Sequence, residues 1–109
     1  MSYTKIGLGI IIIVVVLSTI FPRTIEVTGT EGLRYSGNYG TLMTMKSVDG
    51  MIPYNVGSVT YDNIGSGSLV AVFQKQDARG TLTVKIKRAG ITLKQSTTRA
   101  SYGAIDVTD

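Results

Sequence analysis

Hydrophobic and polar residues follow two different patterns along this chain. Residues 6–21 form one apolar run without a charged side chain. From residue 24 onward, hydrophobic and polar residues alternate in short stretches that glycine-containing segments separate. A long apolar run indicates a helix in a bilayer or in a buried core, whereas alternation with a period of two indicates half-buried strands. We therefore predict a tail and transmembrane helix over residues 1–23 and a β domain over residues 24–109.

The apolar run is short for a membrane span. At about 1.5 Å per residue a helix over residues 6–21 extends about 24 Å, less than the hydrocarbon core of about 30 Å. Its flanks can supply the missing length, because Tyr3 suits the interface and Lys5 and Arg23 can reach the headgroups. Pro22 ends the helix, since proline cannot continue it. The residues expected to contact lipid are Ile6, Leu8, Ile10, Ile13, Val16, Leu17, Ile20 and Phe21.

Two other interpretations of the run stay open. A cleaved signal peptide needs small residues before the cleavage site, but the chain has no alanine before Ala71. A helix buried in the core of a filament or virion is the second alternative. For an anchored protein, the short tail before the run favours a cytoplasmic N-terminus and an extracytoplasmic C-terminal domain, because long domains cross membranes largely regardless of charge.

The β domain is expected to be an antiparallel β-sandwich of about seven strands, which makes the fold class all-β. The clearest strands are residues 24–28, with Ile25 and Val27 inward, and residues 81–87, with Leu82, Val84 and Ile86 inward. Further strands are expected at residues 33–39, 41–48, 56–61, 69–74, 91–95 and 100–107.

Local patterns predict how these strands are connected and covered. Asp49-Gly50 and Ala89-Gly90 have the composition of tight hairpin turns. Residues 38–40 are expected to bend the chain, and residues 62–68 to form a loop. The stretch 69–74 is nearly all apolar, so we expect it to be covered on both faces. The methionines Met43, Met45 and Met51 are expected to fill the core.

Composition argues against an enzyme. The 109 residues include no cysteine, histidine or tryptophan. This removes thiolate chemistry, the commonest general base and the commonest metal ligand. The seven carboxylates are scattered, without the spacing of a calcium loop or of a local carboxylate pair. We predict a non-catalytic protein without a catalytic residue, a bound cofactor or a metal.

The net charge of +4 comes from basic residues that gather late in the chain. Lys85 and Lys87 share one face of a predicted strand, and Lys94 lies across the predicted Ala89-Gly90 turn. These lysines are a possible contact face for acidic lipid or an acidic partner surface; alternatively they form a solvated strand face that resists aggregation. Nucleic acid is not an expected partner, because no aromatic residue lies among these cations.

The tyrosines offer a second possible contact surface, for a sugar or a protein partner. The alternative is packing in the sandwich with the hydroxyl at the rim, as is common for this side chain. The residues concerned are Tyr35, Tyr39, Tyr54, Tyr61 and Tyr102.

Five short segments follow one another along the β domain: Ile25-Glu26-Val27-Thr28-Gly29-Thr30 directly after the apolar run, Ile52-Pro53-Tyr54, Ser66-Gly67-Ser68-Leu69-Val70-Ala71, Gly80-Thr81-Leu82-Thr83-Val84-Lys85-Ile86 with Gly90, and Ser101-Tyr102-Gly103-Ala104. In this order they resemble motifs of the mycobacterial small membrane protein (MmpS) family. The chain departs from the family in lacking the paired cysteines and in having Tyr54 where the family has tryptophan. The resemblance implies a single-pass protein whose extracytoplasmic β-sandwich assists a larger membrane transporter.

Together these patterns predict a single-pass, membrane-anchored accessory subunit. Its helix would lie in the lipid bilayer within a larger membrane protein complex, and its sandwich would contact that complex outside the membrane. The alternatives are a structural subunit of a filament or virion and a transporter accessory protein of the MmpS kind.

Overall fold

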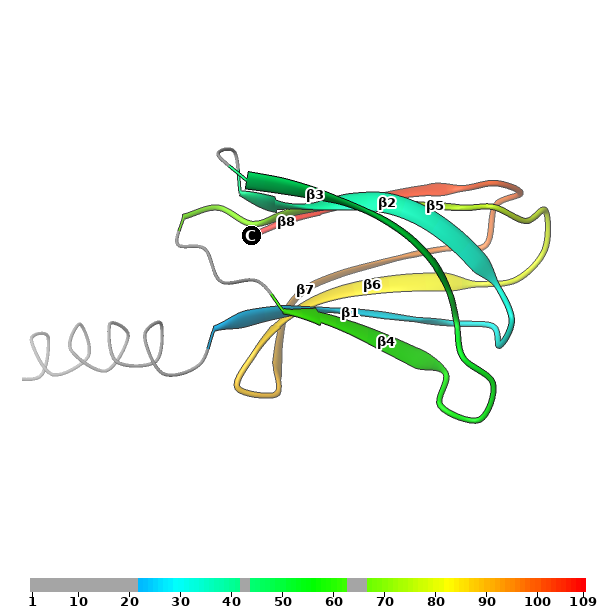
Figure 1. Ribbon diagram of the computed structural model, residues 1–109, viewed down its shortest axis with the longest axis horizontal. Coiled ribbons are helices and arrows are strands. Elements are labelled where there is room, and N and C mark those ends of the chain that lie inside the picture. The colour runs from blue at the N-terminus through cyan, green and yellow to red at the C-terminus, as the bar shows by residue number, and fades with distance from the viewer. Residues whose placement is uncertain (1–21, 42–43, 63–66) are drawn as a thin grey trace, which may run out of the picture.

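The computed structural model describes residues 22–41, 44–62 and 67–109. These residues form two four-stranded antiparallel sheets that pack face to face as a β-sandwich of eight strands (Figure 1). The strand order is β4-β1-β6-β7 in the first sheet and β3-β2-β5-β8 in the second. The strands are β1 (Arg23–Gly29), β2 (Arg34–Thr41), β3 (Thr44–Met51), β4 (Ser58–Asp62), β5 (Val70–Lys75), β6 (Leu82–Arg88), β7 (Ile91–Thr98) and β8 (Ala104–Thr108). The all-β sandwich predicted from the alternation is confirmed.

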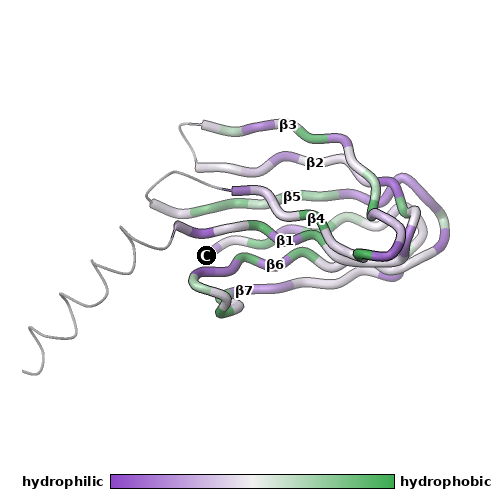
Figure 2. Tube along the Cα trace, turned by 60° about the horizontal axis from the view of Figure 1, so that its bottom comes forward, coloured by the Kyte–Doolittle hydropathy of each residue, from purple (hydrophilic) through white to green (hydrophobic). Residues whose placement is uncertain are grey.

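The centre of the first sheet follows the predicted alternation. Ile25 and Val27 of β1 pair with Ile86 and Val84 of β6, and all four side chains are fully buried. Hydrophobic and hydrophilic positions alternate along both strands (Figure 2). Because residues opposite each other in a ladder project to the same side, this pairing gives the first sheet one continuous apolar face toward the second sheet.

The prediction that residues 69–74 are covered on both faces is wrong. Ala71 and Phe73 of β5 point into the core and are fully buried, whereas Val72 between them is 39% exposed. No element in the described part of the chain covers the outer side of this strand. The apolar sequence of β5 therefore places hydrophobic side chains on the core face and on the outer face alike.

The predicted turn at Asp49-Gly50 is also wrong, because both residues lie inside β3. They pair with Ser36 and Tyr35 of β2, which itself continues through the predicted bend at residues 38–40. A Cβ atom at Gly50 would lie 2.5 Å from the Tyr35 hydroxyl oxygen. Gly50 is therefore a site where an aromatic side chain passes close to the backbone.

The β3 register also places methionines outside the core. Met45 pairs with Gly40 and Met51 pairs with Arg34, on the outer side of the sheet. They are 48% and 42% exposed, so the expectation that they fill the core is wrong for both. Met43 lies outside the described residues.

The predicted hairpin at Ala89-Gly90 is confirmed. Both residues have positive φ, 52° for Ala89 and 78° for Gly90, and they connect β6 to β7. Two central residues of this kind match the twist of antiparallel strands. The loop predicted over residues 62–68 lies partly outside the described residues.

Among the residues that the structure describes, no helix has the length and hydropathy needed to cross a membrane. The predicted anchor, from Ile6 to Phe21, lies outside the described residues.

Candidate partner-binding surface

The outer faces of the two sheets differ in chemistry. In the first sheet, the register of β4, β1 and β6 places polar and charged side chains outward. These residues are Thr24, Glu26, Thr28, Ser58, Thr60, Asp62, Thr83, Lys85 and Lys87. A face of this composition is typical of a sheet in contact with water.

Charged groups on the first sheet are paired with one another. The Glu26 carboxylate lies between two cations: Lys87 Nζ is 3.3 Å from Oε2, and Lys85 Nζ is 3.9 Å from Oε1. Lys85 and Lys87 thus share one strand face, as the alternation predicts, and a carboxylate of the neighbouring strand offsets part of their charge. Ion pairs with this much exposure contribute at most about 1 kcal/mol to stability.

Lys94 does not join the two lysines on that face. It pairs with Ile86, whose side chain is buried between the sheets. Residues directly opposite each other project to the same side, so Lys94 projects to the opposite side of the sheet from Lys85 and Lys87. The three lysines of the predicted contact face therefore lie on two sides of the first sheet, Lys85 and Lys87 on the inner strand β6 and Lys94 on the edge strand β7.

The outer face of the second sheet carries exposed apolar side chains. Met45 and Met51 come from β3, Val72 from the centre of β5, and Ala104 from β8. We call these four residues, together with the polar and charged residues that the same registers place between them, the second-sheet face; the latter are Arg34, Ser36, Asn38, Ser47, Asp49, Gln74 and Asp106. Interface cores are enriched in methionine relative to the rest of a protein surface.

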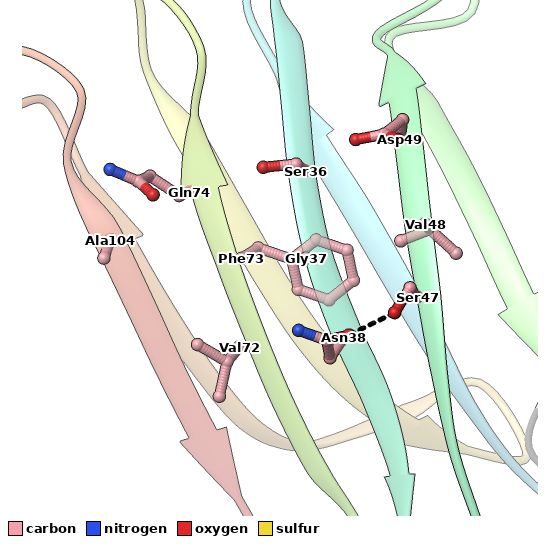
Figure 3. A pocket seen from close by; sticks show the side chains of 10 residues that line it. All are labelled: Ser36, Gly37, Asn38, Ser47, Val48, Asp49, Val72, Phe73, Gln74 and Ala104. Carbon is pink, nitrogen blue, oxygen red and sulfur yellow. Dashed lines mark hydrogen bonds between the residues drawn. The ribbon is translucent and has the colours of Figure 1, made fainter.

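A shallow hollow of about 330 Å³ lies in the middle of the second-sheet face. Its lining residues are Ser36, Gly37, Asn38, Ser47, Val48, Asp49, Val72, Phe73, Gln74 and Ala104 (Figure 3). The Ser47 hydroxyl donates a hydrogen bond of 2.6 Å to Asn38 Oδ1, and the Gln76 amide donates one of 2.7 Å to Ser36 Oγ. Short side chains on neighbouring strands leave this part of the sheet open.

An aromatic cluster supports the hollow from inside the sandwich. The Phe73 ring lies against β2 at Gly37, where a Cβ atom would come within 2.7 Å of ring carbon Cδ1 (Figure 3). Phe73 contacts Tyr35 edge to face, with ring centroids 5.8 Å apart, and Tyr61 at 6.3 Å. Tyr39 contacts Tyr61 at 5.3 Å. These large side chains make the core directly beneath the hollow close-packed.

The cluster also joins the two sheets through a polar contact. The hydroxyl oxygens of Tyr35 on β2 and Tyr61 on β4 are 2.7 Å apart. Burial raises the pKa of Tyr35 well above its usual range, and the hydrogen bond and electrostatic interaction with Tyr61 raise it further. Tyr54 and Tyr102 are instead exposed, so the five tyrosines do not form one surface.

The sequence contains no direct signal for the second-sheet face. Val72 lies in an apolar stretch, and Met45 and Met51 have the composition of core residues, so each was expected to be buried. Their exposure depends on which strands neighbour β5 and β3, and that information lies elsewhere in the chain.

No protein-family model matches this chain, and no curated protein matches it. Within the described segments, no three acidic side chains lie close enough together to hold a metal ion.

Proposed function

We propose that this protein is a non-catalytic, single-pass accessory subunit of a larger membrane protein complex. The apolar run would lie in the bilayer, with the N-terminus cytoplasmic and the sandwich extracytoplasmic. The sandwich would contact a membrane-embedded partner through the second-sheet face.

The observation that carries this proposal is the short connection between the apolar run and the sandwich. β1 begins at Arg23, two residues after Phe21. Two extended residues span about 7 Å at most. The Arg23 guanidinium is also bonded to Asp109 Oδ1 at 2.6 Å, which fixes the start of β1 to the body of the domain. An anchored sandwich of this kind stays beside the membrane surface, where it reaches membrane-embedded partners.

The second-sheet face supports contact with a protein. Methionine side chains are flexible and polarizable, and they adapt to an irregular apolar surface. The hydrogen-bonded serine and asparagine side chains around the hollow suit the polar part of such an interface. The first sheet, with its paired charges, has the composition of the solvated side.

Affinity purification of the full-length protein from membranes in mild detergent tests the proposal. The decisive variant is Val72→Glu, which introduces a charge at the centre of the second-sheet face. We expect recovery of the co-purifying membrane protein to fall at least about tenfold, the effect of about 1.4 kcal/mol of lost binding free energy. Crosslinking before solubilisation, followed by mass spectrometry, identifies the partner.

Thr28→Glu is the matched control, because it places the same charge on the outer face of a central strand in the first sheet. It should leave recovery within about twofold of the unmodified protein. The proposal fails if the full-length protein purifies alone as a monomer. Ordered polymers in electron micrographs support the filament or virion alternative instead, and recovery of a large transporter supports the MmpS-like alternative.

A further inference from the structure

The hairpin between β6 and β7 lies at the same end of the sandwich as the start of β1 (Figure 1). Arg88, the last residue of β6, pairs directly with Arg23. Opposed Cα atoms in an antiparallel ladder are about 5 Å apart. If residues 6–21 cross a bilayer, as the proposed function holds, this hairpin also lies close to the membrane surface.

The hairpin exposes apolar side chains at this end. Ile91, directly after the Ala89-Gly90 turn, is 66% exposed, and Leu93 is 39% exposed. Ile91 is the first residue of β7 after the turn. No strand residue lies beyond Ile91 on this side to cover its side chain. A bilayer interface provides an apolar environment for such a residue.

Cations without a carboxylate partner accompany these apolar residues. Arg23 is paired with Asp109, and Lys87 with Glu26, but neither Arg88 nor Lys94 forms an ion pair with any described residue. The Nε atom of Arg88 is buried without a hydrogen-bond partner among the described residues.

Among the described residues at this end, the acidic groups are fewer than the cations. Glu26 and Asp109 are engaged in the ion pairs given above, and Asp62 lies opposite Thr24 on the far side of β1. On the side of β1 that carries the hairpin, Arg88 and Lys94 therefore present positive charge that no described carboxylate pairs, next to exposed apolar side chains. Apolar residues flanked by Lys and Arg are typical of segments that bind anionic membrane surfaces.

We propose that the Arg88–Ile91 hairpin is a membrane-surface contact, in which Ile91 enters the interface of the bilayer and Arg88 and Lys94 bind anionic phospholipid headgroups. This contact sets the orientation of the sandwich on the membrane, with its strands pointing away from the bilayer. It rests on the proposed function, because it requires residues 6–21 to span the same bilayer.

The absence of cysteine from the chain allows a clean test on the full-length protein in vesicles. An environment-sensitive fluorophore is attached at Ala89→Cys in the hairpin or, as a control, at Tyr102→Cys in the turn before β8 at the opposite end. The two sites are matched, since both residues are exposed and have φ of 52°. Quenching by a nitroxide on the lipid headgroup region and by aqueous iodide then reports the depth of each label.

In vesicles of phosphatidylcholine and phosphatidylglycerol, we expect the nitroxide to quench the Ala89→Cys label at least about threefold more than the Tyr102→Cys label. Iodide should quench the labels in the opposite order. When Arg88→Gln and Lys94→Gln are added to the Ala89→Cys protein, nitroxide quenching of its label should fall in these anionic vesicles. When Ile91→Ser is added instead, the quenching should fall in vesicles with or without phosphatidylglycerol. Thermal unfolding of each variant verifies that the sandwich is intact.

Equal quenching of the two labels, in protein that still floats with the vesicles, overturns the hairpin contact and leaves the anchored-subunit proposal standing. If nitroxide quenches the Ala89→Cys label equally in pure phosphatidylcholine and in vesicles that contain phosphatidylglycerol, the role of the anionic headgroups is overturned. Protein that does not float with the vesicles overturns both proposals, because the anchor itself then fails.

Discussion

At the scale of single residues, the interior of the sandwich depends on side chains that fill the space left by glycines or reach across the core to a polar partner. Tyr35 packs against Gly50 of its own sheet and meets the Tyr61 hydroxyl of the other. Lys75, also fully buried, uses its ammonium group to donate a hydrogen bond of 2.8 Å to the Ala100 carbonyl. Buried polar groups of this kind require partners, because losing one leaves the desolvation cost uncompensated. They therefore tie particular residues together, and the Tyr35–Tyr61 contact does so between the two sheets.

The Tyr35 hydroxyl predicts a loss of stability in alkaline solution. Its pKa is raised in the fold, so the folded state retains the proton that the unfolded chain releases above about pH 10. The free energy of unfolding should therefore be unaffected by this group below about pH 10, and should fall by up to about 1.4 kcal/mol per pH unit above it.

Urea unfolding of the full-length protein at a series of pH values tests this prediction. Tyr35→Phe should cost about 1 kcal/mol near neutrality, through the lost bond to Tyr61, and should flatten the alkaline decline. Tyr102→Phe, at an exposed position, should change neither quantity. An alkaline decline as steep in Tyr35→Phe as in the unmodified protein would contradict the assignment.

At the scale of elements, β3 shows how a strand can contain a sequence typical of a turn. Asp49-Gly50 has the composition of a hairpin, yet both residues are paired within the ladder to β2. The pairing of Ser36 with Asp49 and of Asn38 with Ser47 continues through them without a break. Burial of the Tyr35 ring over Gly50 favours the extended strand, since a turn at this point would leave the ring uncovered.

Gly50→Ala tests whether close packing of the Tyr35 ring requires glycine at this position. The added methyl group would meet the Tyr35 ring, so we expect a loss of about 2 kcal/mol in the free energy of unfolding. Ser47→Ala, at an exposed position of the same strand, should cost about 0.5 kcal/mol or less. Equal stability of the two variants in urea would indicate that the ring moves aside without cost.

At the scale of the whole molecule, one ion pair joins the two sheets at the end where β1 begins. Arg23 begins β1 of the first sheet, and Asp109 follows β8 of the second. The same Asp109 oxygen accepts a hydrogen bond of 3.0 Å from the backbone nitrogen of Leu69, which precedes β5. Force or motion at the start of β1 is therefore passed to both sheets, and an anchored sandwich would move as one body.

A double-mutant cycle with Arg23→Ala and Asp109→Ala tests this connection. The pair is largely buried, with side-chain exposures of 7% and 15%. Each single variant should therefore lower the free energy of unfolding by about 3 kcal/mol, because it leaves the other charge buried without a partner. The double variant should cost clearly less than the sum of the two. Lys87→Ala, which breaks a more exposed ion pair, should cost less than about 1 kcal/mol. Additive single and double effects would contradict the coupling of the two residues.

Much of the fold could be predicted from local pattern. Alternation identified β1 and β6 with the correct inward residues, and Ala89-Gly90 identified the hairpin, because both signals lie within a few neighbouring residues. The candidate contact surface could not be predicted in this way. Lys85 and Lys87 were correctly placed on one face, whereas Val72, Met45 and Met51 were expected in the core.

The sequence by itself determined that the chain after residue 22 forms strands with one buried face, because the side chains of a strand alternate between its two sides. Only the tertiary structure decided which strands are neighbours and which apolar side chains remain uncovered. Strand order placed Val72 on an open outer face, register separated Lys94 from Lys85 and Lys87, and packing of Tyr35 kept Gly50 in a strand. The physical reason is that alternation records which residues share a side, whereas burial depends on partners that are distant in the chain.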